Sequence, residues 1–180
     1  MPSGKTHDNV AWYCFLPFAY FSWYFSNDLL VVILYSVAYF FSNFMFSGDL
    51  DLVSIQSKRW GIFRWIWIPY RKMIPHRSKW SHGILHGTVF RIIYLGAFLA
   101  VFYGLVYFVT QQFIPSFNKD LVVNTNKSVS FLKNQQPIYF AAIFLGLLTG
   151  ATLHTSADVI VSFIKKNFKK YKKKKTKKKK

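Results

Sequence analysis

The chain has 180 residues, enough for one domain, of which 52% are hydrophobic and 21% aromatic. Its net charge is +18, and its six acidic residues are all aspartates. A soluble domain covers its surface with charges of both signs, so this composition argues against an ordinary soluble protein and favours an integral membrane protein. The single cysteine, Cys14, excludes an internal disulfide and a thiolate metal cluster.

Four apolar stretches predict membrane-spanning helices, which need about 20 apolar residues to cross a hydrocarbon core of about 30 Å. In chain order they cover residues 10–25, 29–46, 84–110 and 137–164. The first two are separated only by a turn around Asn27 and predict a helical hairpin. Because backbone polar groups in lipid must be satisfied internally, we expect an all-α integral membrane bundle of about four transmembrane helices.

Basic residues indicate the orientation of this bundle. The loop between the second and third stretches carries seven lysines and arginines, and residues 165–180 carry twelve lysines. The positive-inside rule then places both termini and the middle loop in the cytoplasm. Residues 111–136 form the predicted outer loop.

Aromatic residues from Trp60 to Tyr70 alternate with Arg64 and Arg71 in the middle loop, and Gly61 to Tyr70 form its most aromatic segment. Tryptophan and tyrosine favour the headgroup level of a bilayer, so we interpret this segment as a cytoplasmic loop lying at the membrane interface. The alternative is a buried core segment of a soluble cap.

The lysine-rich end of the chain differs in composition from the rest. We assign residues 1–164 to a membrane metal-binding domain and residues 165–180 to a disordered polylysine tail. The partners expected are membrane lipids, and the tail would bind an anionic lipid surface. Nucleic acid is the less favoured partner, because the tail directly follows a predicted span.

Histidines and aspartates concentrate on the predicted cytoplasmic side. All five histidines and four of the six aspartates fall there, contributed by all four predicted spans: His7, Asp8, Asp49, Asp51, His76, His82, His86, His154 and Asp158. His154 and Asp158 lie within an apolar stretch, where ionisable groups are costly and usually face a partner. Their spacing of four residues places both on one helical face. His82 and His86 have the same spacing and would share a face if the third span begins early.

This combination of imidazoles and carboxylates predicts a divalent metal site. Without thiolates, the donors suit zinc, manganese or iron. The predicted ligands are His7, Asp49, His76, His82, His86, His154 and Asp158, and the predicted general bases are Asp8 and Asp51. Since these exceed the needs of one ion, either two ions bind or some residues orient the ligands.

Less specific roles remain open for several of these residues. Asp8 suits a helix cap, and Asp49 suits a cap or an ion pair with Arg59. His76 and Arg77 could be ordinary basic residues of a loop. Ser81 beside His82 is a less favoured candidate nucleophile.

The motifs resemble those of membrane-bound metal-dependent hydrolases of bacterial inner membranes. The resemblance is carried by Thr6-His7-Asp8, Gly48-Asp49-Leu50-Asp51, His76-Arg77-Ser78, Ser81-His82-Gly83, and His154 with Asp158. Residues 1–8, 58–61 and 65–70 look like a cyanobacterial branch of metal-binding membrane proteins. The broader family often has a proline before its first aspartate, where this chain has Ser47-Gly48. The resemblance implies a metal-binding protein of a plasma or thylakoid membrane.

Three functions follow as hypotheses. The first is a metal-dependent hydrolase acting at the cytoplasmic interface, with Arg77 or Arg59 holding a phosphate oxygen of its substrate. The alternative is a non-catalytic metal-binding structural or assembly factor. A metal transporter ranks last, because the first two spans carry no ionisable residue in mid-span.

Overall fold

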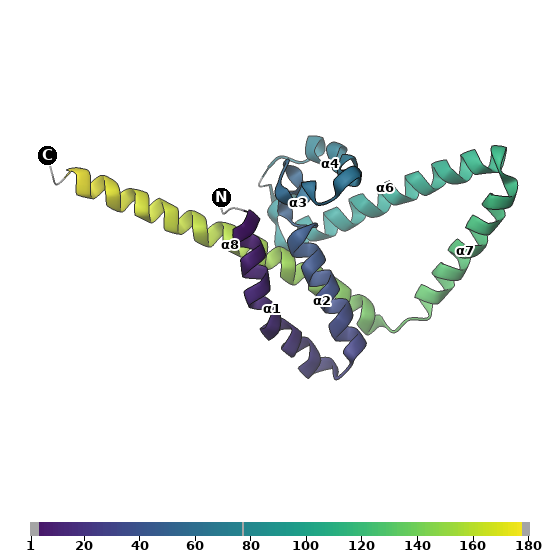
Figure 1. Cartoon of the computed structure of the whole chain (residues 1–180), viewed down its shortest axis with the longest axis horizontal. Coiled ribbons are helices and arrows are strands. Elements are labelled where there is room, and N and C mark those ends of the chain that lie inside the picture. Colours follow the sequence, from purple (N-terminus) through teal and green to yellow (C-terminus); the bar gives the residue numbers. More distant parts are fainter. Residues whose placement is uncertain (1–3, 77, 178–180) are drawn as a thin grey trace.

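The computed structural model describes residues 4–76 and 78–177, and within these ranges every regular element is helical. Figure 1 shows their arrangement. The elements in chain order are α1 (Gly4–Ser26), α2 (Leu29–Phe44), η1 (Gly48–Asp51), α3 (Ile55–Lys58), η2 (Gly61–Ile66), α4 (Trp67–Met73), α5 (Lys79–His82), α6 (Ile84–Phe113), α7 (Pro115–Lys133) and α8 (Pro137–Lys177).

The helices α1 and α2 form the hairpin that the sequence predicts. Asn27 turns the chain with a positive φ of 48°, a conformation that asparagine tolerates better than most residues. Asp28 then caps α2, its side chain accepting a hydrogen bond from the Leu30 backbone N–H at 2.8 Å. Inside the hairpin, the Tyr39 hydroxyl donates to the Ala11 carbonyl at 2.7 Å.

The helix α8 lies against α2, and two glycines permit this close approach. A Cβ atom on Gly146 would lie 2.5 Å from the Tyr35 carbonyl oxygen, and one on Gly150 would lie 2.5 Å from the Ser42 Cβ. The Ser42 hydroxyl donates to the Leu147 carbonyl at 2.7 Å. Small residues spaced by four and hydroxyl hydrogen bonds are typical of helix pairs within membranes.

The segment between α2 and α6 folds into a small helical cap. Trp67 and Tyr70 are fully buried in its core, and the Trp60 indole donates to the Met45 carbonyl at 2.8 Å. Ile62 and Trp65 remain exposed on the same segment. Residues 61–70 therefore combine a buried core face, the alternative left open above, with an exposed apolar face that suits a membrane interface.

Two of the described helices are long and apolar enough to cross a membrane: α6, over Ile84–Phe113, and α8, over Pro137–Phe168. The helix α2 is apolar but shorter. These findings support membrane association, whereas a bundle of four membrane spans remains an expectation. In Figure 1, α6 and α7 project away from the group formed by α1, α2 and α8, and α7 returns to the start of α8.

Three local features differ from the expectations. The predicted outer loop contains the helix α7, which begins at Pro115, a favoured residue for a first helical turn. The helix α8 continues to Lys177, into the lysine-rich segment, because lysine is a good helix former and extends a helix already nucleated. The assignment of residues 165–180 to a separate disordered tail stays a prediction. The helical conformation is also interrupted at Gly83, between α5 and α6, and this changes how His82 and His86 are placed.

Candidate metal centre

Three segments bring carboxylates and imidazoles to one place beside the cap. The short helix η1 carries Asp49 and Asp51, α5 carries His82, and α8 carries His154 and Asp158. Within α8 the spacing of four residues places its two groups on one face, as the sequence predicted.

The loop that contains η1 approaches α5 closely because it begins with glycine. A Cβ atom on Gly48 would lie 3.2 Å from the Ser81 carbonyl oxygen and 3.3 Å from the His82 ring. The Arg71 side chain donates to the Leu50 carbonyl at 3.2 Å, between the two aspartates of η1. A glycine directly before a candidate ligand, as Gly48 precedes Asp49, is the sequence signal of such a close approach.

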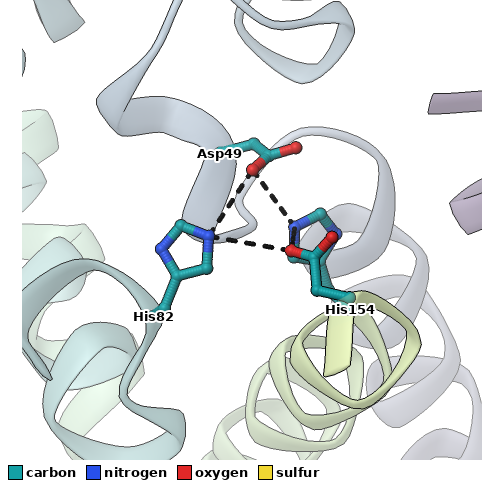
Figure 2. A group of neighbouring side chains, drawn as sticks. Asp49, His82 and His154 are labelled. Carbon is teal, nitrogen blue, oxygen red and sulfur yellow. Dashed lines mark ion pairs between the residues drawn. The ribbon is translucent and has the colours of Figure 1, made fainter. Parts of the chain in front are cut away.

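Four side-chain atoms face one another at the centre of this cluster. Asp49 Oδ1 lies 3.5 Å from His154 Nε2 and 3.6 Å from His82 Nε2. Asp158 Oδ2 lies 3.8 Å from each of the same two nitrogens. All four atoms lie within 4.8 Å of one another. Figure 2 shows Asp49, His82 and His154 pointing toward a common point.

These four atoms are buried, yet none of them has a hydrogen-bond partner among the described residues. Their separations of 3.5–3.8 Å exceed the usual length of a hydrogen bond. Burying polar atoms without partners is costly, so this arrangement calls for a group that all four can bind.

A divalent metal ion fits the donors and their spacing. Two imidazole nitrogens and two carboxylate oxygens suit zinc, manganese or iron. A tetrahedral zinc ion with ligands at about 2.0–2.1 Å would space them roughly 3.3–3.4 Å apart. The four nitrogen–oxygen separations of 3.5–3.8 Å are slightly larger and all pairs lie within 4.8 Å, so an inward movement of the side chains would complete the coordination.

Electrostatics in the cluster keep the Asp49 carboxyl group ionised. Burial alone would raise its pKa, but the neighbouring imidazoles of His154 and His82 outweigh burial and hold the pKa of Asp49 below its ordinary value. A carboxylate that stays ionised is ready to bind a cation at neutral pH.

A second cluster of polar side chains lies on the Nδ1 side of the His82 ring. Asp51, whose side chain is fully buried, accepts from His76 Nδ1 at 3.0 Å, and its other oxygen lies 3.6 Å from His82 Nδ1. The Ser81 hydroxyl lies 3.0 Å from the same His82 nitrogen. Carboxylates often orient a metal-binding imidazole through its second nitrogen, and Asp51 is placed for that role. Asp51, His76 and His82 also have the composition of a second small metal site.

Ser81 is fully buried, and its hydroxyl also donates to the Ser78 carbonyl at 3.3 Å. This setting does not favour the role of nucleophile.

His7 reaches the edge of the cluster from α1. Its ring stacks on the His154 ring with centroids 4.1 Å apart, and its Nε2 atom lies 3.6 Å from Asp158 Oδ1. His7 therefore contacts a different oxygen of the Asp158 carboxylate from the one near His82 and His154. His7 is placed to orient Asp158 and His154 rather than to join the four central atoms.

Two predicted site residues are not brought to the cluster. The break at Gly83 ends the helix between His82 and His86, so their spacing of four no longer places them on one face. His86 is instead exposed and meets the edge of Trp80. Asp8 makes a two-point ion pair with Arg59, which leaves neither group directed at the cluster. Arg77 lies outside the described residues.

Comparisons with known proteins also indicate metal binding. Residues 2–168 match the model of a family described as uncharacterized metal-binding protein (DUF2227). An uncharacterized protein of Aquifex aeolicus is 30% identical over 140 residues, which cover 73% of this chain and 92% of the relative. No solved structure matches. These matches support neither a hydrolase family nor the cyanobacterial branch that the sequence motifs resemble. The match over most of the chain shows that this protein belongs to the metal-binding family DUF2227.

Proposed function

We propose that the chain is a membrane-embedded, metal-dependent hydrolase whose metal centre lies at the cytoplasmic interface. The main support for a metal site is a set of four buried atoms that face one another and have no hydrogen-bond partner among the described residues. They belong to Asp49, His82, His154 and Asp158. Family membership supports the same conclusion about metal.

The membrane placement rests on the apolar helices and the basic residues around them. With α6 and α8 as spans, and α1 and α2 completing a bundle of four, the candidate metal centre lies at the end from which Lys165 and Lys166 continue α8. Positive residues favour the cytoplasmic side. The tail would then bind anionic headgroups beside the site, each lysine contributing about 1 kcal/mol.

Hydrolysis is favoured over a purely structural role by the kind of donors. Structural zinc sites are mostly built from cysteines, whereas histidine and carboxylate ligands are common in hydrolytic sites. The single cysteine, Cys14, lies in α1 outside the cluster. An ion that takes a fifth or sixth ligand beyond the four protein atoms would bind water, lower the pKa of that water toward about 7 and polarise a substrate oxygen.

Hydrolysis also needs a group that accepts a proton from water, and His76 with Asp51, beside the four central atoms, would supply it. His76 is hydrogen-bonded to the buried Asp51, while about a third of its own side chain is exposed (32%). A proton accepted by this imidazole is stabilised by the carboxylate and can be passed to solvent. An interfacial site would take an amphiphilic ester or phosphoester.

The alternative is a non-catalytic metal clamp, and one observation favours it. Four protein atoms would fill a four-coordinate ion and join η1, α5 and α8 without an open position. The two functions differ in what happens when the ion is present but Asp51 is changed.

The experiment compares wild type with Asp51→Asn in detergent, both loaded with zinc, manganese or iron and screened against soluble and lipid-like esters and phosphoesters. A hydrolase should cleave a substrate, and the variant should keep its metal but lose activity by about 10²- to 10⁴-fold. Metal-loaded wild type that cleaves nothing, yet unfolds at lower temperature when metal is removed, would identify the clamp instead.

A further inference from the structure

Arg91 is a cation buried in an apolar helix. It lies two turns into α6 and is only 1% exposed. A charged side chain at such a position is costly and usually marks a functional interaction. The metal centre described above does not include Arg91 among its ligands, so its contacts need a separate explanation.

The guanidinium group of Arg91 binds the backbone that precedes His82. Its Nη1 atom donates to the Ser81 carbonyl at 2.7 Å, and its Nη2 atom donates to the Thr88 hydroxyl at 3.3 Å. It also lies over the Phe46 ring, 5.6 Å from the centroid, just before the loop that carries Asp49. One planar side chain thus connects α6 with α5 and with the end of the chain segment leading to η1.

Two glycines leave room for this carbonyl. A Cβ atom on Gly87 would lie 2.8 Å from the Ser81 carbonyl oxygen, and one on Gly48 would lie 3.2 Å from it. The Ser81 carbonyl therefore occupies a socket formed by two glycines and Arg91.

The helix α5 needs such an anchor because it has a single turn. A helix of this length, Lys79–His82, is not stable by itself, and carbonyls near a helix end lack partners within the helix. Whatever fixes the Ser81 carbonyl also fixes the direction of the next side chain, His82.

We infer that Arg91 is a positioning residue of the metal centre, which holds the Ser81 carbonyl and so aims His82 Nε2 at Asp49 and Asp158. This inference rests on the proposed metal binding. Removing a nearby positive charge would by itself strengthen the binding of a cation. Weaker binding after loss of Arg91 would therefore report lost positioning rather than lost charge.

The test uses four variants of the full chain in detergent, with Zn²⁺ affinity measured by chelator competition and ligand geometry by the visible absorption of bound Co²⁺. Arg91→Met removes the anchor, and Arg91→Lys restores one donor. Gly87→Ala keeps Arg91 but displaces the Ser81 carbonyl. Gly96→Ala is the matched control on the same helix, since a Cβ atom there would contact nothing within 4 Å.

We expect Arg91→Met and Gly87→Ala to bind Zn²⁺ about 10- to 100-fold more weakly, with an altered Co²⁺ spectrum. Arg91→Lys should recover part of the affinity, and Gly96→Ala should match wild type. If Arg91→Met does not fold, Gly87→Ala decides alone. Wild-type affinity and spectrum in Gly87→Ala, and in Arg91→Met where it folds, would overturn the inference and leave the metal centre standing. Wild type that binds neither ion would overturn the proposed function and the inference with it.

Discussion

Replacing His154 with alanine removes the most deeply buried of the four central side chains. Only 1% of the His154 side chain is exposed, and its Nε2 atom lies 3.5 Å from Asp49 Oδ1. The substitution therefore deletes one of four ligand atoms and leaves a gap beside the His7 ring that stacks on it.

The loss in metal affinity can be estimated from the size of the ligand set. Structural zinc sites bind with apparent free energies of about 10–16 kcal/mol, so one ligand of four corresponds to about 2.5–4 kcal/mol. At about 1.4 kcal/mol per factor of ten, His154→Ala should weaken Zn²⁺ binding about 10²- to 10³-fold. The assay is chelator competition with detergent-purified protein, together with thermal unfolding with and without Zn²⁺.

His86→Ala provides the control, because it removes the same chemical group from an exposed position that the structure does not bring to the cluster. It should bind Zn²⁺ as wild type does and keep the rise in unfolding temperature on adding Zn²⁺. Equal losses in the two variants, or a loss in His86→Ala alone, would refute the assignment of the four central atoms.

Three further outcomes are expected. Arg59→Ala breaks a partly exposed ion pair with Asp8, so chemical denaturation should show a loss of about 1 kcal/mol or less and Zn²⁺ affinity should not change; a tenfold weaker affinity would contradict this placement of Asp8. Gly146→Leu forces a side chain toward the backbone of α2, so it should lower the free energy of unfolding by about 1–3 kcal/mol or more. Gly104→Leu, with open space around it, should not lower it. Equal effects would contradict the packing of α2 on α8. Because the imidazoles of His154 and His82 hold the pKa of Asp49 below its ordinary value, its carboxyl group in metal-free protein should remain unprotonated at about pH 4, as measured by infrared spectroscopy against Asp49→Asn. An Asp49 carboxyl group that is largely protonated at about pH 4 would contradict its placement between the two imidazoles.

The sequence predicts the helices well where apolar stretches are long. The predicted stretches 29–46, 84–110 and 137–164 begin at the same residues as α2, α6 and α8. Length and apolar composition determine such helices locally. The helix α7 lies where polar residues favoured a loop, and the core of the cap depends on tertiary packing of Trp67 and Tyr70, which no local pattern reveals.

In the candidate site, too, local spacing predicts contacts within one helix but not contacts between distant segments. His154 and Asp158 share a face because both lie in one continuous helix, so their spacing sufficed. The same rule would place His86 beside His82 only if the third predicted span began early, and Gly83 instead interrupts the helix between them. The pairing of Asp8 with Arg59 joins residues 51 positions apart, a long-range contact beyond the reach of spacing rules.

The most direct test of metal binding is elemental analysis of the detergent-purified chain after loading with zinc, manganese or iron and removal of free ion. The comparison is the His82→Ala, His154→Ala double variant, checked for retained helical content by circular dichroism. The arrangement of the four central atoms predicts about one ion per chain in wild type and a loss of nearly all of it in the double variant. Wild type that holds no metal after loading, or a folded double variant that holds as much as wild type, would contradict the proposed centre.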